Sequence, residues 1–159
     1  MNPILLSFLG NGNAALFRDN DSVFTFSVHC GANLFSERQT SDLDVELEIG
    51  CGDQEYLETL SLYLPELMHR VRPNLVFFQA GVDPHEQDRL GRLVLSRAGL
   101  RERNRLVYNT VRAHGVKLVV TMGGGYPNSS DEASAAFDTI MQAHADVYRD
   151  MAEVYYGRP

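Results

Sequence analysis

Cysteines and long apolar runs are scarce in this sequence, and each shortage argues against a class of protein. Cys30 and Cys51 are the two cysteines among 159 residues, and they do not form a CxxC pair. A thiolate zinc site is therefore not expected, and we interpret them as reduced thiols in a cytoplasmic protein. The apolar stretch at residues 3–9 is too short to span a membrane and lacks the basic start of a signal peptide.

Basic residues are also few. Lysine and arginine total 14 against 21 acidic residues, for a formal net charge of −7, and no run of basic residues stands out. Such a chain has no general attraction to nucleic acids or anionic membranes, so neither is predicted as a partner. With 44% hydrophobic and 22% charged residues, the composition is that of a globular protein. The length predicts one domain over residues 1–159.

Short apolar runs alternate with helical patterns, which favours an α/β fold. Buried strands are expected at residues 4–8, 22–28, 75–80 and 117–122, with an edge strand at 45–49 and a polar loop at 30–41. A short helix is expected at residues 14–18, after a turn at 10–12. The sum predicts a three-layer α/β/α arrangement, with helices on both faces of a mainly parallel sheet.

Three longer helices are also expected. The first begins with Asp53 as N-cap and ends near residue 71, and Pro65 inside it should kink or split it. The second covers residues 100–114 and is closed by Gly115. Ser129 and Glu132 have the spacing of a capping box before a last helix that ends near residue 156.

Two predicted strand ends carry unusual sequence, at residues 81–85 and 123–126. Chemistry in parallel sheets gathers beyond the carboxyl ends of the strands. Asp83 is either a metal ligand or base, or a turn residue that binds backbone amides ahead of a proline. His85 is either a second ligand or an ordinary loop histidine. Tyr126, after three glycines, either donates a hydrogen bond to an oxyanion or packs beneath its loop.

Several segments together resemble one family. They are GVDPHEQDRLGRLVLS at 81–96, TMGGGY at 121–126, GNGNAALFRDNDSVFTFSVH at 10–29, SDLDVEL at 41–47 and GDQEYL at 52–57. In this order they resemble the C-terminal half of zinc-dependent histone deacetylases, with the class IV and bacterial branch nearest in character. The resemblance covers nearly the whole chain from Gly10 onward. It implies a truncated arginase/deacetylase-like fold.

The resemblance also implies a site. Members of this family hold one zinc ion with Asp, His and Asp, and they hydrolyse N-acetyl amides such as acetyl-lysine or acetylpolyamines. By this resemblance Asp83 is the third zinc ligand and Tyr126 is the oxyanion donor, whereas His85 is not a ligand. Gly81, Phe35 and Gly124 correspond to substrate-binding positions.

Two structural cation sites, for potassium or sodium, are implied in the same way. Ser27 and Val28 correspond to ligands of the first site. Phe17, Asn20 and Val23 correspond to backbone ligands of the second.

The first two zinc ligands of the family fall on apolar residues here. Counting back from Gly10, the ligand positions are Leu6 and Phe8, and the preceding Asp of the motif falls on Ile4. The family's catalytic histidine pair would precede residue 1. One carboxylate cannot hold catalytic zinc, so the chain is expected to be inactive alone, with zinc absent or weakly bound. A piece of a longer gene, a natural short protein and a site rebuilt between subunits all remain possible explanations.

Three functions remain open at this point. The first is an amide hydrolase acting on an acetylated small molecule or an acetyl-lysine peptide. The second is a non-catalytic scaffold or binding module, and the third is a different α/β hydrolase or small-molecule binder. A sheet cut through its middle should leave an uncovered edge, so a homo-oligomer is expected, formed by pairing the strand at 4–8 with its copy.

Overall fold

The computed structural model describes residues 3–7, 11–32 and 39–157, and it contains one parallel sheet. The sheet order is β3-β2-β1-β4-β5. The strands are β1 (Pro3–Ser7), β2 (Phe24–Cys30), β3 (Leu43–Leu47), β4 (Leu75–Gln79) and β5 (Lys117–Thr121). Each neighbouring pair is parallel, which confirms the predicted α/β class. The strand expected at 45–49 lies at an edge of the sheet, two residues earlier in the chain.

The first strand lies in the middle of the sheet, and this corrects an expectation. In β1, Leu6 is opposite Phe26 of β2 on one side and Phe78 of β4 on the other. Because both edges of β1 are already hydrogen-bonded within the chain, it is not free to pair with a copy of itself. The sheet edges are β3 and β5 instead. Self-association stays a prediction, without this route to it.

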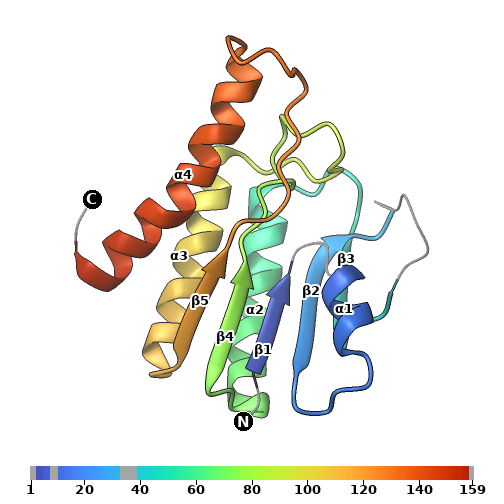
Figure 1. Ribbon diagram of the computed structural model, residues 1–159, viewed down its shortest axis with the longest axis vertical. Helices are drawn as coiled ribbons and strands as arrows, with labels where there is room; N and C mark the ends of the chain where they lie inside the picture. Colours follow the sequence, from blue (N-terminus) through green and yellow to red (C-terminus); the bar gives the residue numbers. More distant parts are fainter. Residues whose placement is uncertain (1–2, 8–10, 33–38, 158–159) are drawn as a thin grey trace.

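The described part of the chain forms four helices around the sheet: α1 (Asn11–Phe17), α2 (Asp53–Val71), α3 (Arg97–Ala113) and α4 (Ala135–Tyr156). Figure 1 shows α2 and α3 on one face and α1 on the other, with α4 lying along α3. Helices therefore occupy both faces, as the sequence predicts. None of the helices in the described ranges combines the length and apolarity of a membrane crossing.

The main core lies between β4 and the two helices behind it. Val76 and Phe78 of β4 are fully buried, whereas Phe77 between them is only partly buried. The Phe78 ring meets Tyr108 of α3 edge-on, with 5.8 Å between ring centroids. This alternation is that of a strand with one fully covered face.

Helix α2 runs without interruption through Pro65, so the expected split is wrong. Pro65 lies on the exposed side of the helix, opposite buried residues such as Leu60, Leu64 and Leu67. The carbonyl that loses its partner at Pro65 can bind water there, which lowers the cost of the proline.

The starts of α1 and α2 differ from those that the sequence predicts. Helix α1 begins at Asn11, inside the expected turn. The N-cap of α2 is Gly52, and Asp53 is the first helical residue. Its carboxylate instead accepts hydrogen bonds from Ser96, at 2.8 Å from the backbone nitrogen and 2.6 Å from the hydroxyl.

Ser96 is itself the N-cap of α3, which therefore begins three residues earlier than expected, while Gly115 follows its end with φ 66° as predicted. Ser134 caps α4, so the capping box at Ser129 and Glu132 is wrong. The Ser129 hydroxyl accepts from the Asp131 nitrogen in a local turn instead.

Candidate active site at the ends of β4 and β5

Two loops meet where β4 and β5 end. We call them the Asp83 loop (residues 80–91) and the Tyr126 loop (residues 122–128). Main-chain bonds join them: Val82 N donates to Gly124 O at 2.6 Å, and Arg89 N donates to Tyr126 O at 2.8 Å. Since β4 and β5 are neighbouring parallel strands, their following loops share one edge of the sheet. The structure thus brings together the two segments that the sequence singled out.

Asp83 is buried, with 5% of its surface exposed, and its side chain turns back over the glycines of both loops. A methyl group at Gly124 would lie 2.7 Å from Asp83 Oδ1 and 3.1 Å from Tyr126 Cε2. One at Gly81 would lie 2.5 Å from the same carboxylate oxygen. Glycine is therefore needed here because the carboxylate and the tyrosine ring approach the same point of the backbone.

Burial also changes the acidity of this carboxylate. It raises the pKa of Asp83 to about 6, and the nearby Asp88 carboxylate adds to the shift. A backbone N–H and the Arg103 guanidinium oppose it. A carboxyl with a perturbed pKa in a strand-end position is a candidate functional group.

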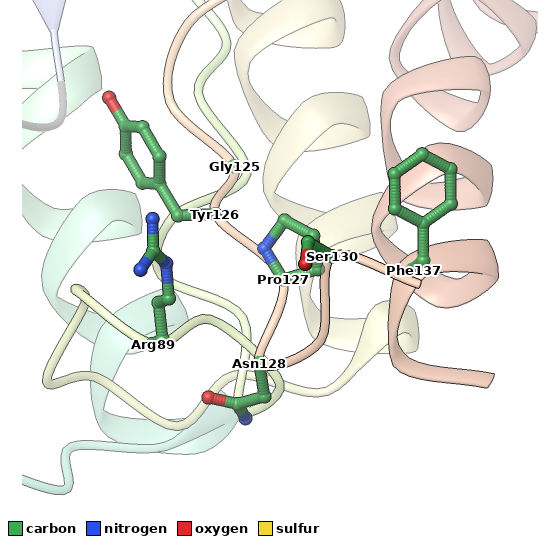
Figure 2. A pocket seen from close by; sticks show the side chains of 7 residues that line it. All are labelled: Arg89, Gly125, Tyr126, Pro127, Asn128, Ser130 and Phe137. Atoms are coloured by element: carbon green, nitrogen blue, oxygen red, sulfur yellow. The ribbon is translucent and has the colours of Figure 1, made fainter. Parts of the chain in front are cut away.

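Tyr126 lies at the surface of the site, with 41% of its area exposed. Its ring borders a cavity of about 430 Å³ whose other lining residues are Arg89, Gly125, Pro127, Asn128, Ser130 and Phe137. In Figure 2 the Arg89 side chain runs up beside the Tyr126 ring, and the tyrosine hydroxyl points away from Pro127 and Phe137. The phenol is thus available to a ligand outside this cavity, and its ring forms one wall of it.

Comparison with known proteins shows which protein family this arrangement belongs to. Residues 8–143 match the family model of the histone deacetylase domain. The chain belongs to the histone deacetylase family. The fold is accordingly that of a truncated deacetylase-like domain.

Relatives with this deacetylase domain are longer. An uncharacterized protein of Picosynechococcus sp. is 42% identical over 139 residues, covering 87% of this chain and 46% of the relative. Histone deacetylase 2 of Arabidopsis thaliana is 30% identical over 124 residues, covering 76% and 32%. A histone deacetylase-like amidohydrolase of Pseudomonas aeruginosa is 29% identical over 129 residues, covering 74% and 34%. The chain spans less than half the length of these relatives.

The zinc ion typical of deacetylases does not fit the donors that the structure describes. Within residues 3–7, 11–32 and 39–157, no cluster of three His, Cys, Asp or Glu side chains could hold a metal ion. By the family resemblance, the two other ligand positions correspond to Leu6 in β1 and to Phe8, which lies outside the described residues. The role of Asp83 as a zinc ligand stays a prediction, because a catalytic zinc site requires three protein ligands.

The predicted cation positions occupy two places near β2. Ser27 and Val28 are buried in the strand, and the Ser27 hydroxyl lies 2.8 Å from His29 Nδ1. Phe17 is the last residue of α1, and Asn20 and Val23 lie between α1 and β2; Asn20 N donates to Phe17 O, and Val23 N donates to Asn20 O. Potassium or sodium binding there stays a prediction. Phe35, predicted at the substrate rim, lies outside the described residues.

His85 is used within its own loop. It is 2% exposed, and its Nδ1 accepts a hydrogen bond from Gln87 N at 2.9 Å. Burial lowers its pKa, so the ring stays neutral and can keep accepting this bond.

Sequence reasoning missed one buried cation beneath the site. Arg103 of α3 is fully buried; its Nη1 donates to Gly81 O at 2.6 Å, and its guanidinium lies 5.6 Å from the centre of the Phe78 ring. Burial lowers its pKa, while nearby Tyr56 and Tyr108 oppose that shift. Helical spacing could have revealed it, because position 103 lies on the same stripe as Leu100 and Val107.

Proposed function

We propose that this chain serves the hydrolysis of N-acetyl amides by carrying Asp83 and Tyr126, and that its residues alone do not complete the reaction. Support comes from one observation: both side chains converge on Gly124, at the joined ends of β4 and β5. Membership of the histone deacetylase family and the deacetylases among its relatives give the reaction class. The substrates would be acetyl-lysine peptides or acetylated small molecules.

Tyr126 has the chemistry to recognise the acyl group. An exposed phenol on a loop tied down by main-chain bonds can donate a hydrogen bond to the carbonyl oxygen of an amide. The same bond strengthens when that oxygen gains negative charge as a nucleophile attacks. Asp83 supplies a buried carboxylate that approaches Gly124 at the same point as the Tyr126 ring.

An alternative function is that of a non-catalytic scaffold or binding module. It is favoured by the apolar residues Ile4, Leu6 and Phe8, which stand where the deacetylase resemblance places an aspartate and two metal ligands. A scaffold would keep the fold and the acyl-binding tyrosine without the reaction. Two measurements separate these functions: zinc content and turnover. Both are made on the purified chain and on a variant in which the missing ligands are restored.

Restoring the ligands is the sharper experiment. The double variant Leu6→Asp/Phe8→His puts the Asp-x-His pair of the family motif into the sequence, with its Asp in β1, the strand next to β4. We expect it to retain close to one equivalent of zinc after desalting, measured by elemental analysis. Adding Asp83→Asn should lower that affinity at least tenfold, whereas adding Asp131→Asn, an exposed acid elsewhere, should leave it unchanged.

The unmodified chain is the baseline. It should retain no stoichiometric zinc and should not turn over a fluorogenic acetyl-lysine peptide. Zinc retention together with turnover by the unmodified chain would contradict the proposed incompleteness. Zinc binding by the double variant that does not depend on Asp83 would contradict the role given to that carboxylate and favour the scaffold.

A further inference from the structure

Asp88 links the Asp83 loop to the Tyr126 loop. Its carboxylate is buried, with 7% of the residue exposed, and it accepts three main-chain hydrogen bonds. Oδ1 accepts from Leu90 N at 2.8 Å and from Gly91 N at 2.7 Å, within its own loop. Oδ2 accepts from Tyr126 N at 2.5 Å, across to the other loop. One side chain therefore ties together segments that lie 38 residues apart in the sequence.

The peptide groups around Tyr126 are held from both directions. The Tyr126 nitrogen donates to Asp88, and the Tyr126 carbonyl accepts from Arg89 N at 2.8 Å. One residue further, Asp88 and Pro127 form an antiparallel bridge, and Asn128 N donates to Gln87 O at 3.1 Å. Fixing the nitrogen and the carbonyl of one residue fixes the direction in which its side chain leaves the backbone.

We propose that Asp88 is a positioning residue, which holds the Tyr126 phenol in its place relative to Asp83. A charged acceptor suits this task because its bonds to N–H groups are shorter and stronger than those of a neutral acceptor. The inference deepens the proposed function and rests on it for the chemical purpose of Tyr126. A displacement of about 1 Å in a group that must meet a reacting atom can cost about a hundredfold in rate.

The variant Asp88→Asn separates this role from that of an ordinary turn residue. Asparagine keeps one oxygen, which can still accept from Leu90 and Gly91, and it presents an NH₂ group to the Tyr126 nitrogen. The turn is therefore kept and the side-chain bond from Asp88 to the Tyr126 nitrogen is lost, while the main-chain bonds between the loops remain. Asp146→Asn is the matched control, because Asp146 is also a buried acid, and its hydrogen bond joins it to Arg97 of α3 and not to the two loops.

The first readout is amide hydrogen exchange of residues 122–128 in the full chain. In Asp88→Asn we expect exchange in this segment to rise at least about tenfold, as loss of a charge-assisted bond predicts. Exchange in β4 should stay within about twofold of the original chain. Asp146→Asn should leave the 122–128 segment unchanged relative to β4.

The second readout follows the tyrosine side chain itself. The chain has 7 tyrosines, so incorporation of 3-fluorotyrosine gives one ¹⁹F signal for each, and Tyr126→Phe identifies the signal of Tyr126. We expect that signal alone to shift or broaden in Asp88→Asn and to stay unchanged in Asp146→Asn. Should Asp88→Asn not fold, Asp88→Ser serves in its place, because a serine hydroxyl keeps the local turn and is too short to reach across.

A Tyr126 signal and a 122–128 exchange rate identical to those of the original chain would overturn the inference. So would equal changes in Asp88→Asn and Asp146→Asn, because they would report a general loss of stability. Neither readout uses zinc or turnover. Failure of the proposed reaction in the zinc experiment is therefore distinguishable from failure of the positioning role.

Discussion

Carboxylates are buried in two regions of the molecule: where α3 packs against α4, and where the Asp83 loop meets the Tyr126 loop. The partners that these carboxylates bind differ between the two regions. Along the helices three arginines face three acids: Arg97 pairs with Asp146 at 2.5 Å, Arg101 with Asp150 at 2.8 Å and Arg105 with Glu153 at 3.1 Å. At the junction, Asp88 is satisfied by three main-chain N–H groups. The other buried carboxylate of the junction, Asp83, lies against glycines.

The difference shows what each region depends on. The arginines of the helix pair recur at every fourth residue and the acids at three- or four-residue steps, so helical geometry alone aligns them. The loop junction depends on the position of the main chain, because its donors are backbone nitrogens and its tight contacts involve backbone atoms. We therefore expect a displaced backbone to destabilise the junction, and the removal of charge to destabilise the helix pair.

The largest effect is expected from a single methyl group at the junction. In Gly91→Ala the added carbon would lie 1.9 Å from the Asp83 carbonyl oxygen, which is a main-chain atom that cannot rotate away. We expect a loss of about 3 kcal/mol or more in the free energy of unfolding, measured by urea denaturation. Gly12→Ala is the control, because nothing lies within 4 Å of the added methyl. An equal loss in both variants would contradict the steric argument.

A smaller effect is expected from removing one charge between the helices. Asp150→Ala deprives the buried Asn104 amide of its acceptor at 3.1 Å and removes the closer of the two acids that pair with Arg101. Arg101 can turn to solvent, whereas the amide cannot, so we expect a loss of about 2 kcal/mol. Glu153→Ala removes a half-exposed partner and should cost at most about 0.5 kcal/mol. Similar losses in the two variants would mean that burial of the acid does not determine how much it contributes to the free energy of unfolding.

The smallest effect is expected from acid. Burial disfavours ionisation of Asp146, but the hydrogen bond and charge of Arg97 outweigh it and lower the pKa of Asp146. A lowered pKa in the folded state adds stability above the unfolded-state pKa of about 4 and loses it as the pH falls through the folded value. The difference in unfolding free energy between the original chain and Asp146→Asn should therefore shrink below pH of about 4. A difference that does not change with pH would contradict this linkage.

Local patterns were sufficient to predict the elements of this fold. The alternation of apolar runs and helical stripes predicts the five strands and the long helices, and glycine after α3 marks its end. The start of α3 was missed because its cap, Ser96, is itself held by Asp53, at a distance of 43 residues. Pro65 was expected to kink or split α2, and the sequence does not show that the proline side of the helix faces water.

By itself, the sequence determined the α/β class and the likeness to deacetylases, and it placed Asp83 and Tyr126 after neighbouring strands. These properties follow from residue spacing, which the chain carries locally. The tertiary structure decided that β1 lies at the centre of the sheet, that Arg103 is buried beneath Gly81, and that Asp88 binds the Tyr126 nitrogen. Those contacts depend on where main-chain donors and acceptors meet between segments that are far apart in the sequence. The identities of the residues do not show which segments will meet.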